Sequence, residues 1–329
     1  IIHEGIFPVV LHAADLCCIF CSISVDTALG TEKNQQHSND CRTARIRNTI
    51  DLLSGAVAFC CRIGMQSKKG YMENLENLFF HPTHSPTGTQ ARIFLFSHAG
   101  AGASYYMRWK KYFDPTFAEV YPVQLPGREN RAKEPLIREF DVLTDQIVET
   151  LAQYTDMPYA FFGHSLGASV CYDTAVKLRN LGLPEPECLI LSANRPPVIK
   201  PDYSFIYSMS DASFCTLLQE NGAMHGDMLE SKEFREAYLP VIRSDFELYA
   251  SYDTKQQTSP LHSDIYALCG DCDPFAAKEH VELWKDYTTG SFQMQAFHGG
   301  HFYLNDHVSE ICEIISNKLH AKISRDLQD

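Results

Sequence analysis

Short apolar runs alternate with segments of helical spacing from residue 91 onward, and this alternation restricts the fold more than any other feature. The runs that predict strands are Ala91–Phe96, Ala118–Leu125, Tyr159–Phe162, Cys188–Ser192, Ile265–Leu268 and Phe292–Phe297. The segments that predict helices are Ser104–Phe113, Phe140–Tyr154, 166–179, 276–287 and 306–319. Strands separated by helices of this length need crossover connections. The pattern therefore predicts an α/β fold, in which helices cover both faces of a mostly parallel sheet.

The alternation stops between Asn194 and Ser263. The intervening residues are largely of helical character and include the segments Ser213–Glu220 and Ser231–Tyr252. A parallel sheet does not need this insertion, so we interpret residues 194–258, approximately, as a helical lid above the strand ends.

The first 72 residues differ from the rest of the chain in charge, cysteine content and periodicity. They carry a net charge of +1, hold six of the twelve cysteines and show no sustained helical or strand period. Met65 and Met72 are both candidate starting points of translation. We therefore expect residues 1–72 to be an N-terminal extension, poorly ordered or non-native, and residues 73–329 to form the domain.

Composition narrows the possible partners. A formal charge of −13 argues against nucleic acid and anionic membranes. No stretch of about 18 uncharged apolar residues occurs, so no transmembrane helix is expected. Twelve cysteines in 329 residues are too dilute for a disulfide scaffold, which favours a reduced, cytoplasmic setting. A monomer is the default expectation.

The sequence Gly163-His164-Ser165-Leu166-Gly167 fits the pattern G-x-S-x-G and lies between a predicted strand and a predicted helix. A nucleophilic serine on such a turn needs glycines on both sides, because the backbones approach closely there. The start of the following helix and the Leu166 amide can stabilise an oxyanion. This context makes Ser165 a candidate nucleophile.

Acids and histidines follow later strands in the order that a Ser–Asp–His triad requires in this kind of fold. Asp271 and Asp273 come after the strand at Ile265–Leu268. His298 and His301 come after the last predicted strand. We favour Asp273, the third residue after the turn glycine, over Asp271, and His301 over His298.

Other residues near these motifs have simpler interpretations. Ala99, in the loop after the first strand, is the candidate for the second oxyanion donor, and His98 and His164 are expected to be structural. The Cys269-x-x-Cys272 spacing could suggest zinc, but a metal there would disrupt the neighbouring acid, so we expect no metal site.

Taken together, the motifs resemble those of the type II thioesterases, the stand-alone hydrolases that accompany nonribosomal peptide and polyketide synthases. The vertebrate medium-chain fatty-acyl carrier thioesterase is a relative of that family. The likeness runs from about Met72 to Leu319. It rests on FLFSHAGAGAS (94–104), VQLPGRENR (123–131), FFGHSLGA (161–168), ILSANRPP (190–197), LPVIRSDFELYASY (239–252), LCGDCDP (268–274) and GGHFYL (299–304).

This resemblance implies an α/β-hydrolase fold with a lid, and a serine thioesterase that hydrolyses acyl groups from the phosphopantetheine arm of acyl or peptidyl carrier proteins. By matching position, Ser165 is the nucleophile, His301 the base and Asp273 the acid, while Ala99 and Leu166 donate oxyanion-hole amides. The family needs neither a metal nor a bound cofactor. Two departures are small: Ser97 replaces the usual proline, and Leu166 replaces the commoner methionine. We expect the change at Leu166 to alter the shape of the acyl pocket.

Three further expectations accompany the resemblance. The basic run of Arg128, Arg131, Lys133 and Arg138 either forms local ion pairs or steers an acidic carrier protein. Apolar lid residues should mostly pack together, and some should line an acyl channel: Phe205, Phe214, Leu217, Leu218, Met224 and Met228. The alternative function is that of a carboxylesterase or lipase that cleaves free esters with the same triad.

Overall fold

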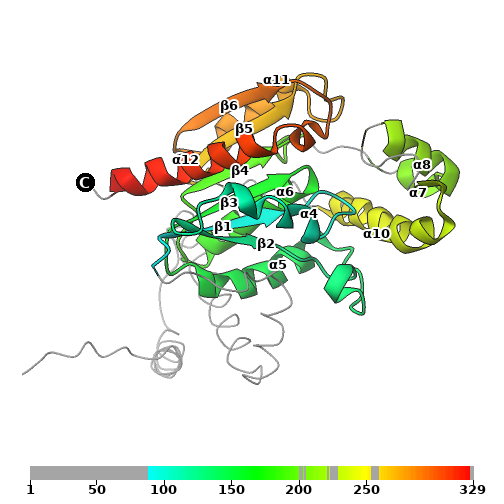
Figure 1. Ribbon diagram of the computed structural model, residues 1–329, viewed down its shortest axis with the longest axis horizontal. Helices are drawn as coiled ribbons and strands as arrows, with labels where there is room; N and C mark the ends of the chain where they lie inside the picture. The colour runs from blue at the N-terminus through cyan, green and yellow to red at the C-terminus, as the bar shows by residue number, and fades with distance from the viewer. Residues whose placement is uncertain are drawn as a thin grey trace, which may run out of the picture. The chain divides into compact units, whose positions relative to one another are not determined.

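The computed structural model describes residues 88–199, 203, 205–220, 222, 229–252 and 259–326. Within them, six parallel strands form one sheet in the order β2-β1-β3-β4-β5-β6 (Figure 1). The strands are β1 (Ala91–Phe96), β2 (Ala118–Pro122), β3 (Tyr159–His164), β4 (Cys188–Ser192), β5 (Asp264–Gly270) and β6 (Phe292–Phe297). The predicted parallel α/β sheet is therefore confirmed.

Both faces of the central strands are buried, which explains why the strands are apolar runs and not alternating ones. In β3, Phe162 packs on one face with Tyr106 and Trp109, while Phe161 packs on the other face against Phe94. The helices and short 3-10 turns of this α/β unit are α4 (Ser104–Met107), η1 (Lys110–Tyr112), η2 (Glu129–Arg131), α5 (Phe140–Leu151), η3 (Ala152–Tyr154), α6 (Leu166–Asn180), α11 (Lys278–Val281), η4 (Glu282–Tyr287), η5 (Tyr303–Asn305) and α12 (Val308–Asp326).

Three helices form the described part of the predicted lid: α7 (Phe205–Ser208), α8 (Asp211–Glu220) and α10 (Lys232–Ser251), which group together in Figure 1. Ser231 begins α10, because its hydroxyl accepts a hydrogen bond from the Phe234 amide. The lid has its own apolar core, formed by Ile206, Phe214, Leu218, Leu229, Leu239 and Ile242. The insertion therefore packs as a unit around α10, as its helical pattern predicts.

Some predicted boundaries differ from the structure. The second strand ends at Pro122 and not at Leu125, because Gln124 turns inward to accept a hydrogen bond from the Ala103 amide. The helix predicted over Ser104–Phe113 is the short α4 followed by η1, and the helix predicted over 276–287 is α11 followed by η4. Apolar spacing alone does not separate these shorter, tighter turns from one α-helix.

Several predictions fall outside the described residues. These are the N-terminal extension at 1–72 and the lid residues Met224 and Met228. Among the residues that are described, no helix is both long enough and apolar enough to cross a membrane.

Candidate active site

Ser165 occupies a sharp turn between β3 and α6. Its backbone has φ 54° and ψ −121°, a conformation that side-chain-bearing residues rarely adopt. The Ser165 amide donates a hydrogen bond of 2.8 Å to the carbonyl of Ser192 at the end of β4. The serine hydroxyl is thereby held above the carboxyl ends of the strands, as the G-x-S-x-G pattern predicts.

The flanking glycines permit this turn. A Cβ at Gly163 would lie 2.2 Å from the Gly167 carbonyl oxygen, and a Cβ at Gly167 would lie 2.3 Å from the Phe96 carbonyl oxygen. Both distances are far below van der Waals contact with backbone atoms that cannot move away. The two glycines of the motif are therefore required by the close approach of β1, β3 and α6.

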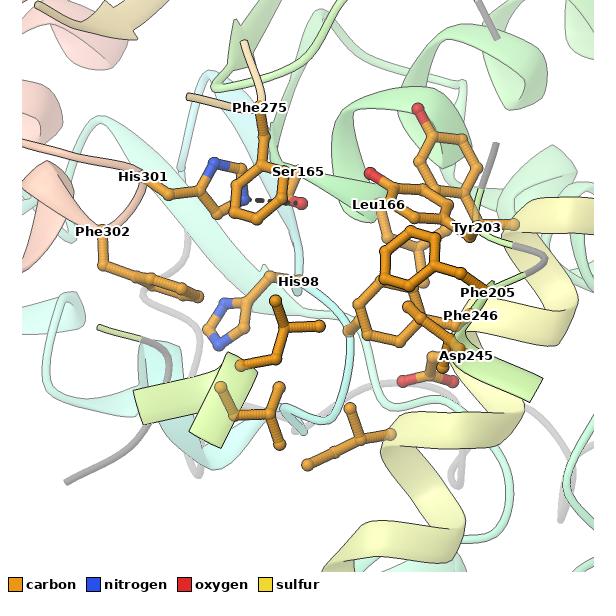
Figure 2. Close-up of a pocket in the computed structure, with 16 residues that line it drawn as sticks. His98, Ser165, Leu166, Tyr203, Phe205, Asp245, Phe246, Phe275, His301 and Phe302 are labelled. Carbon is orange, nitrogen blue, oxygen red and sulfur yellow. Dashed lines mark hydrogen bonds between the residues drawn. The ribbon is translucent and has the colours of Figure 1, made fainter. Parts of the chain in front are cut away.

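His301 lies between Ser165 and Asp273, and Figure 2 shows its ring directed at the serine hydroxyl. The His301 Nε2 atom is 3.0 Å from Ser165 Oγ, and its Nδ1 atom is 2.8 Å from Asp273 Oδ2. The carboxylate fixes the ring so that Nδ1 carries the proton and Nε2 faces the serine. Residues far apart in the sequence thus form one continuous hydrogen-bonded chain.

The two candidate acids have different partners. Asp273 is buried, and its second oxygen accepts hydrogen bonds from the amides of Phe275 (2.8 Å) and Ala276 (3.3 Å). Asp271 is exposed instead. Its pKa is lowered to about 2, mainly by the hydrogen bond from the Gly299 amide and secondly by the hydrogen bond with His298. The structure therefore brings Asp273, and not Asp271, to the histidine that faces Ser165.

Two further histidines lie around this centre. His164 is fully buried, and its Nδ1 atom is 2.8 Å from the Ser192 hydroxyl. Burial is the main cause that lowers the His164 pKa well below 6.5, and the nearby His301 and His98 lower it further. The His98 ring packs edge-on against Tyr105 and Phe302, and desolvation lowers its pKa to about 3. Both rings are therefore neutral near pH 7, in keeping with the structural roles expected for them.

The two predicted oxyanion donors line the same pocket as Ser165. Leu166 is the first residue of α6, and the amide of Leu166 forms no backbone hydrogen bond with any described residue, nor does that of Ala99. Ala99 precedes Gly100, whose amide donates a hydrogen bond of 2.7 Å to Asp245 Oδ2 on the lid helix α10. The loop after β1 is thus fixed from the lid side.

An apolar pocket of about 70 Å³ opens at Ser165 (Figure 2). Lid residues form much of its wall, and they include three residues expected there, Phe205, Leu217 and Leu218. Phe214 lies instead in the lid core. Leu166 also lines the pocket, so the departure from methionine at this position does reach the pocket wall. The cavity suits an apolar group attached to a carbonyl at the serine.

Asn194 is a component of the site that the sequence did not reveal. Its side-chain amide donates hydrogen bonds of 2.7 Å to the Ser165 carbonyl and to the Ser169 hydroxyl. Its side-chain oxygen accepts a hydrogen bond of 2.8 Å from the hydroxyl of Tyr249 on α10. Asn194 therefore ties the nucleophile turn to the lid. Two signals in the sequence pointed to it: its place just after β4, at the start of the insertion, and its membership of the motif ILSANRPP (190–197).

The three arginines of the basic run after β2 form ion pairs. Arg128 is buried against Asp245, and the pairs Arg131–Glu134 and Arg138–Glu247 have N–O distances of 2.6 Å each. The interpretation as a patch that steers an acidic partner fails for these three residues because each charge is locally neutralised. Arg128 instead braces the loop that contains it.

The two cysteines with the CxxC spacing lie in different environments. Cys269 is buried in β5, whereas Cys272 is exposed. In the part of the chain that the structure describes, no group of three or more His, Cys, Asp or Glu side chains is arranged to hold a metal ion.

A strained serine, a buried carboxylate and a histidine follow one another along the chain in this order, each after a strand of a parallel sheet. This arrangement defines the serine hydrolases of the α/β-hydrolase fold. The model of the thioesterase domain family matches residues 91–319. The chain therefore belongs to the thioesterase domain family, and it is a thioester hydrolase.

Individual relatives agree with this assignment. The chain is 35% identical over 241 residues to Thioesterase PikA5 of Streptomyces venezuelae, and the aligned region covers 73% of this chain and 84% of PikA5. It is 32% identical over 251 residues to the human S-acyl fatty acid synthase thioesterase, medium chain, and this aligned region covers 75% of this chain and 92% of the human protein. Among solved structures, the RedJ thioesterase of the prodiginine pathway of Streptomyces coelicolor superposes with a TM-score of 0.66 at 29% identity, covering 72% of this chain and 96% of RedJ.

Proposed function

We propose that this enzyme hydrolyses acyl thioesters on the phosphopantetheine arm of acyl or peptidyl carrier proteins, and so clears misprimed carriers in nonribosomal peptide, polyketide or fatty acid synthesis. The observation that carries the proposal is the Ser165–His301–Asp273 chain at the mouth of an apolar pocket. The names of the relatives support the context, because they include PikA5, a gramicidin S biosynthesis protein and a fatty acid synthase thioesterase.

In the first half of the reaction, Ser165 Oγ attacks the thioester carbonyl while His301 Nε2, 3.0 Å away, accepts the hydroxyl proton. Asp273 stabilises the positively charged imidazole that results. The carbonyl oxygen becomes negative and receives hydrogen bonds from the Ala99 and Leu166 amides. The carbon–sulfur bond then breaks, the thiol takes the proton from His301, and the acyl group remains on Ser165.

In the second half, water attacks the acyl-serine carbonyl while His301 again accepts a proton. The same two amides stabilise the negative oxygen. The bond to Ser165 Oγ breaks, the serine recovers its proton from His301, and the carboxylic acid leaves. Both steps use only side chains, backbone amides and water, so we propose that the enzyme requires no metal and no cofactor beyond the arm that the substrate carries.

The remaining aspects of the proposal concern partners and setting. One chain supplies every residue of the mechanism, which supports activity as a monomer, and size-exclusion chromatography with light scattering tests this. The net charge of −13 supports the absence of nucleic acid among its partners. The cytoplasm, where carrier-dependent synthesis and reduced thiols occur together, is the setting we propose.

The direct test is intact-mass spectrometry of an acetyl-loaded carrier protein incubated with the enzyme or with Ser165→Ala. We expect the acetyl mass to disappear only with the wild type. The proposal is wrong if the acetyl group persists with both proteins while the wild type cleaves a simple p-nitrophenyl ester, because that result belongs to a carboxylesterase or lipase.

A further inference from the structure

A second, larger cleft meets the apolar pocket at the catalytic centre. It has a volume of about 830 Å³ and shares His98, Ala99 and His301 with the pocket. Its outer wall contains several polar side chains that the pocket lacks: Tyr105, Arg108, Glu220, Asn305 and Asp306. A thioester bound at Ser165 can thus place its apolar acyl group in the pocket and its other half in the polar cleft.

Arg108 stands at the end of α4, on the wall of this cleft, and its side chain is exposed. Its Nη2 atom donates a hydrogen bond of 3.0 Å to Asn305 Oδ1, and its guanidinium lies 5.1 Å from the centre of the Tyr105 ring. The Tyr105 hydroxyl donates to the same Asn305 oxygen at 2.6 Å. These contacts orient the guanidinium while leaving donors available to a ligand.

Among the described residues, no carboxylate lies within ion-pair distance of Arg108. Six other arginines of the domain each pair with at least one carboxylate: Arg92, Arg128, Arg131, Arg138, Arg243 and Arg325. Arg179, Arg195 and Arg235 have no ion pair with a described carboxylate either, but none of these three lines the cleft. An uncompensated, oriented arginine on a strongly acidic protein is suited to bind an anion, and guanidinium matches the geometry of phosphate.

The position of Arg108 fits the length of the substrate arm. Its guanidinium lies 5.1 Å from the Tyr105 ring, and that ring lies 4.8 Å from the His98 ring, which borders both cavities. Thirteen bonds separate the sulfur of pantetheine from its phosphorus, a span of about 15 Å if it extends as a peptide chain does. This span exceeds the distance between the Arg108 guanidinium and the His98 ring, which is at most about 10 Å. The arm is therefore long enough to extend along the cleft from His98 to Arg108.

We propose that Arg108 binds the phosphate group of the phosphopantetheine arm and that the cleft from His98 to Asn305 holds the pantetheine. This inference rests on the carrier-thioester function proposed above, and it assigns a binding residue to that substrate. Glu220 and Asp306 also line the cleft, so the local charge is mixed and the attraction to phosphate is modest.

The test compares three acetyl thioesters that share one reacting group: acetyl-pantetheine, acetyl-phosphopantetheine and an acetyl-loaded carrier protein. For Arg108→Gln, we expect KM to rise about three- to tenfold for both phosphate-bearing substrates, with kcat unchanged. The KM for acetyl-pantetheine should not change, because this substrate lacks the phosphate. Lys111→Gln removes the same charge three residues away, outside the residues that line the cleft, and should leave all three KM values as in the wild type.

Each result separates the possibilities. If wild-type enzyme cleaves none of the thioesters, the proposed function itself fails. If Arg108→Gln cleaves all three like the wild type, the phosphate site is wrong and the function stands. A higher KM for the carrier protein alone would also overturn the assignment, because Arg108 would then contact the carrier surface and not the phosphate. Equal losses on all three substrates, including acetyl-pantetheine, would indicate a structural role.

Discussion

Asp245, on the lid helix α10, and Arg128, in the loop after β2, form a buried ion pair with two parallel hydrogen bonds of 2.6 Å. The same carboxylate accepts the Gly100 amide at 2.7 Å, and Arg128 also donates to the Ala101 carbonyl at 3.2 Å. One pair thus joins the lid, the loop after β2 and the loop that carries Ala99. Bidentate geometry of this kind is the strongest form of such a contact.

We expect Asp245→Asn to lower the free energy of unfolding by about 3–5 kcal/mol, because it leaves the buried Arg128 charge without a counter-charge. Urea denaturation followed by circular dichroism measures this change. Arg138→Gln is the matched control: its pair with Glu247 is exposed, so the loss should stay below about 1 kcal/mol. Equal losses for the two variants would contradict the importance given to the buried pair.

The two neighbouring acids should differ in their effect on catalysis. Asp273→Asn keeps the shape but cannot hold the His301 Nδ1 proton in the same way, so kcat should fall by about 10⁴-fold. Asp271→Asn changes an exposed side chain bonded to His298 and Gly299, and we expect a loss of less than about tenfold. Steady-state kinetics of both variants on one acyl thioester measures the two losses. A larger loss of kcat in Asp271→Asn than in Asp273→Asn would make Asp271 the acid of the triad.

The turn at Ser165 stores backbone strain, since its φ of 54° is costly for any residue with a Cβ. Ser165→Gly should therefore be more stable than Ser165→Ala by about 1 kcal/mol, although both remove the nucleophile and both should be inactive. Thermal unfolding of the two variants side by side tests this. An alanine variant as stable as the glycine variant would show that the turn is not strained.

His164 should make the fold sensitive to acid. Its pKa is well below 6.5 in the folded protein because of burial, whereas the unfolded chain binds a proton at about 6.5. The unfolded state therefore binds more protons below pH 6.5, and stability falls as the pH decreases from there by up to about 1.4 kcal/mol per pH unit.

The control for this pH effect is His164→Asn, which keeps a polar group near the Ser192 hydroxyl but cannot titrate. Urea denaturation at pH 7, 6 and 5 should give a shallower decrease for the variant than for the wild type. Parallel slopes for the two proteins would show that His164 does not supply the proton-linked loss.

Local sequence predicted the sheet and much of the site. The inner strands β3, β4 and β5 are recognisable because they are buried on both faces, whereas the edge strand β6 alternates apolar residues with glutamine. The glycines around Ser165 mark a turn that only glycine allows. The short 3-10 turns η1 and η4 were predicted as parts of longer helices, because apolar spacing is nearly the same in both structures. The order of serine, acid and histidine could be followed along the chain because each one comes after a strand.

The partners of polar side chains were decided by the tertiary structure. Arg128 sits in a basic run in the sequence, yet its counter-charge, Asp245, is on a helix of the insertion. Asn194 joins Ser165 to Tyr249 only because the lid helix α10 comes close to the turn after β4. The amino-acid sequence determined which segments are buried and where the chain must turn, since these depend on near neighbours. Ion pairs and hydrogen bonds depend on approach across the fold, and only the packed structure fixes them.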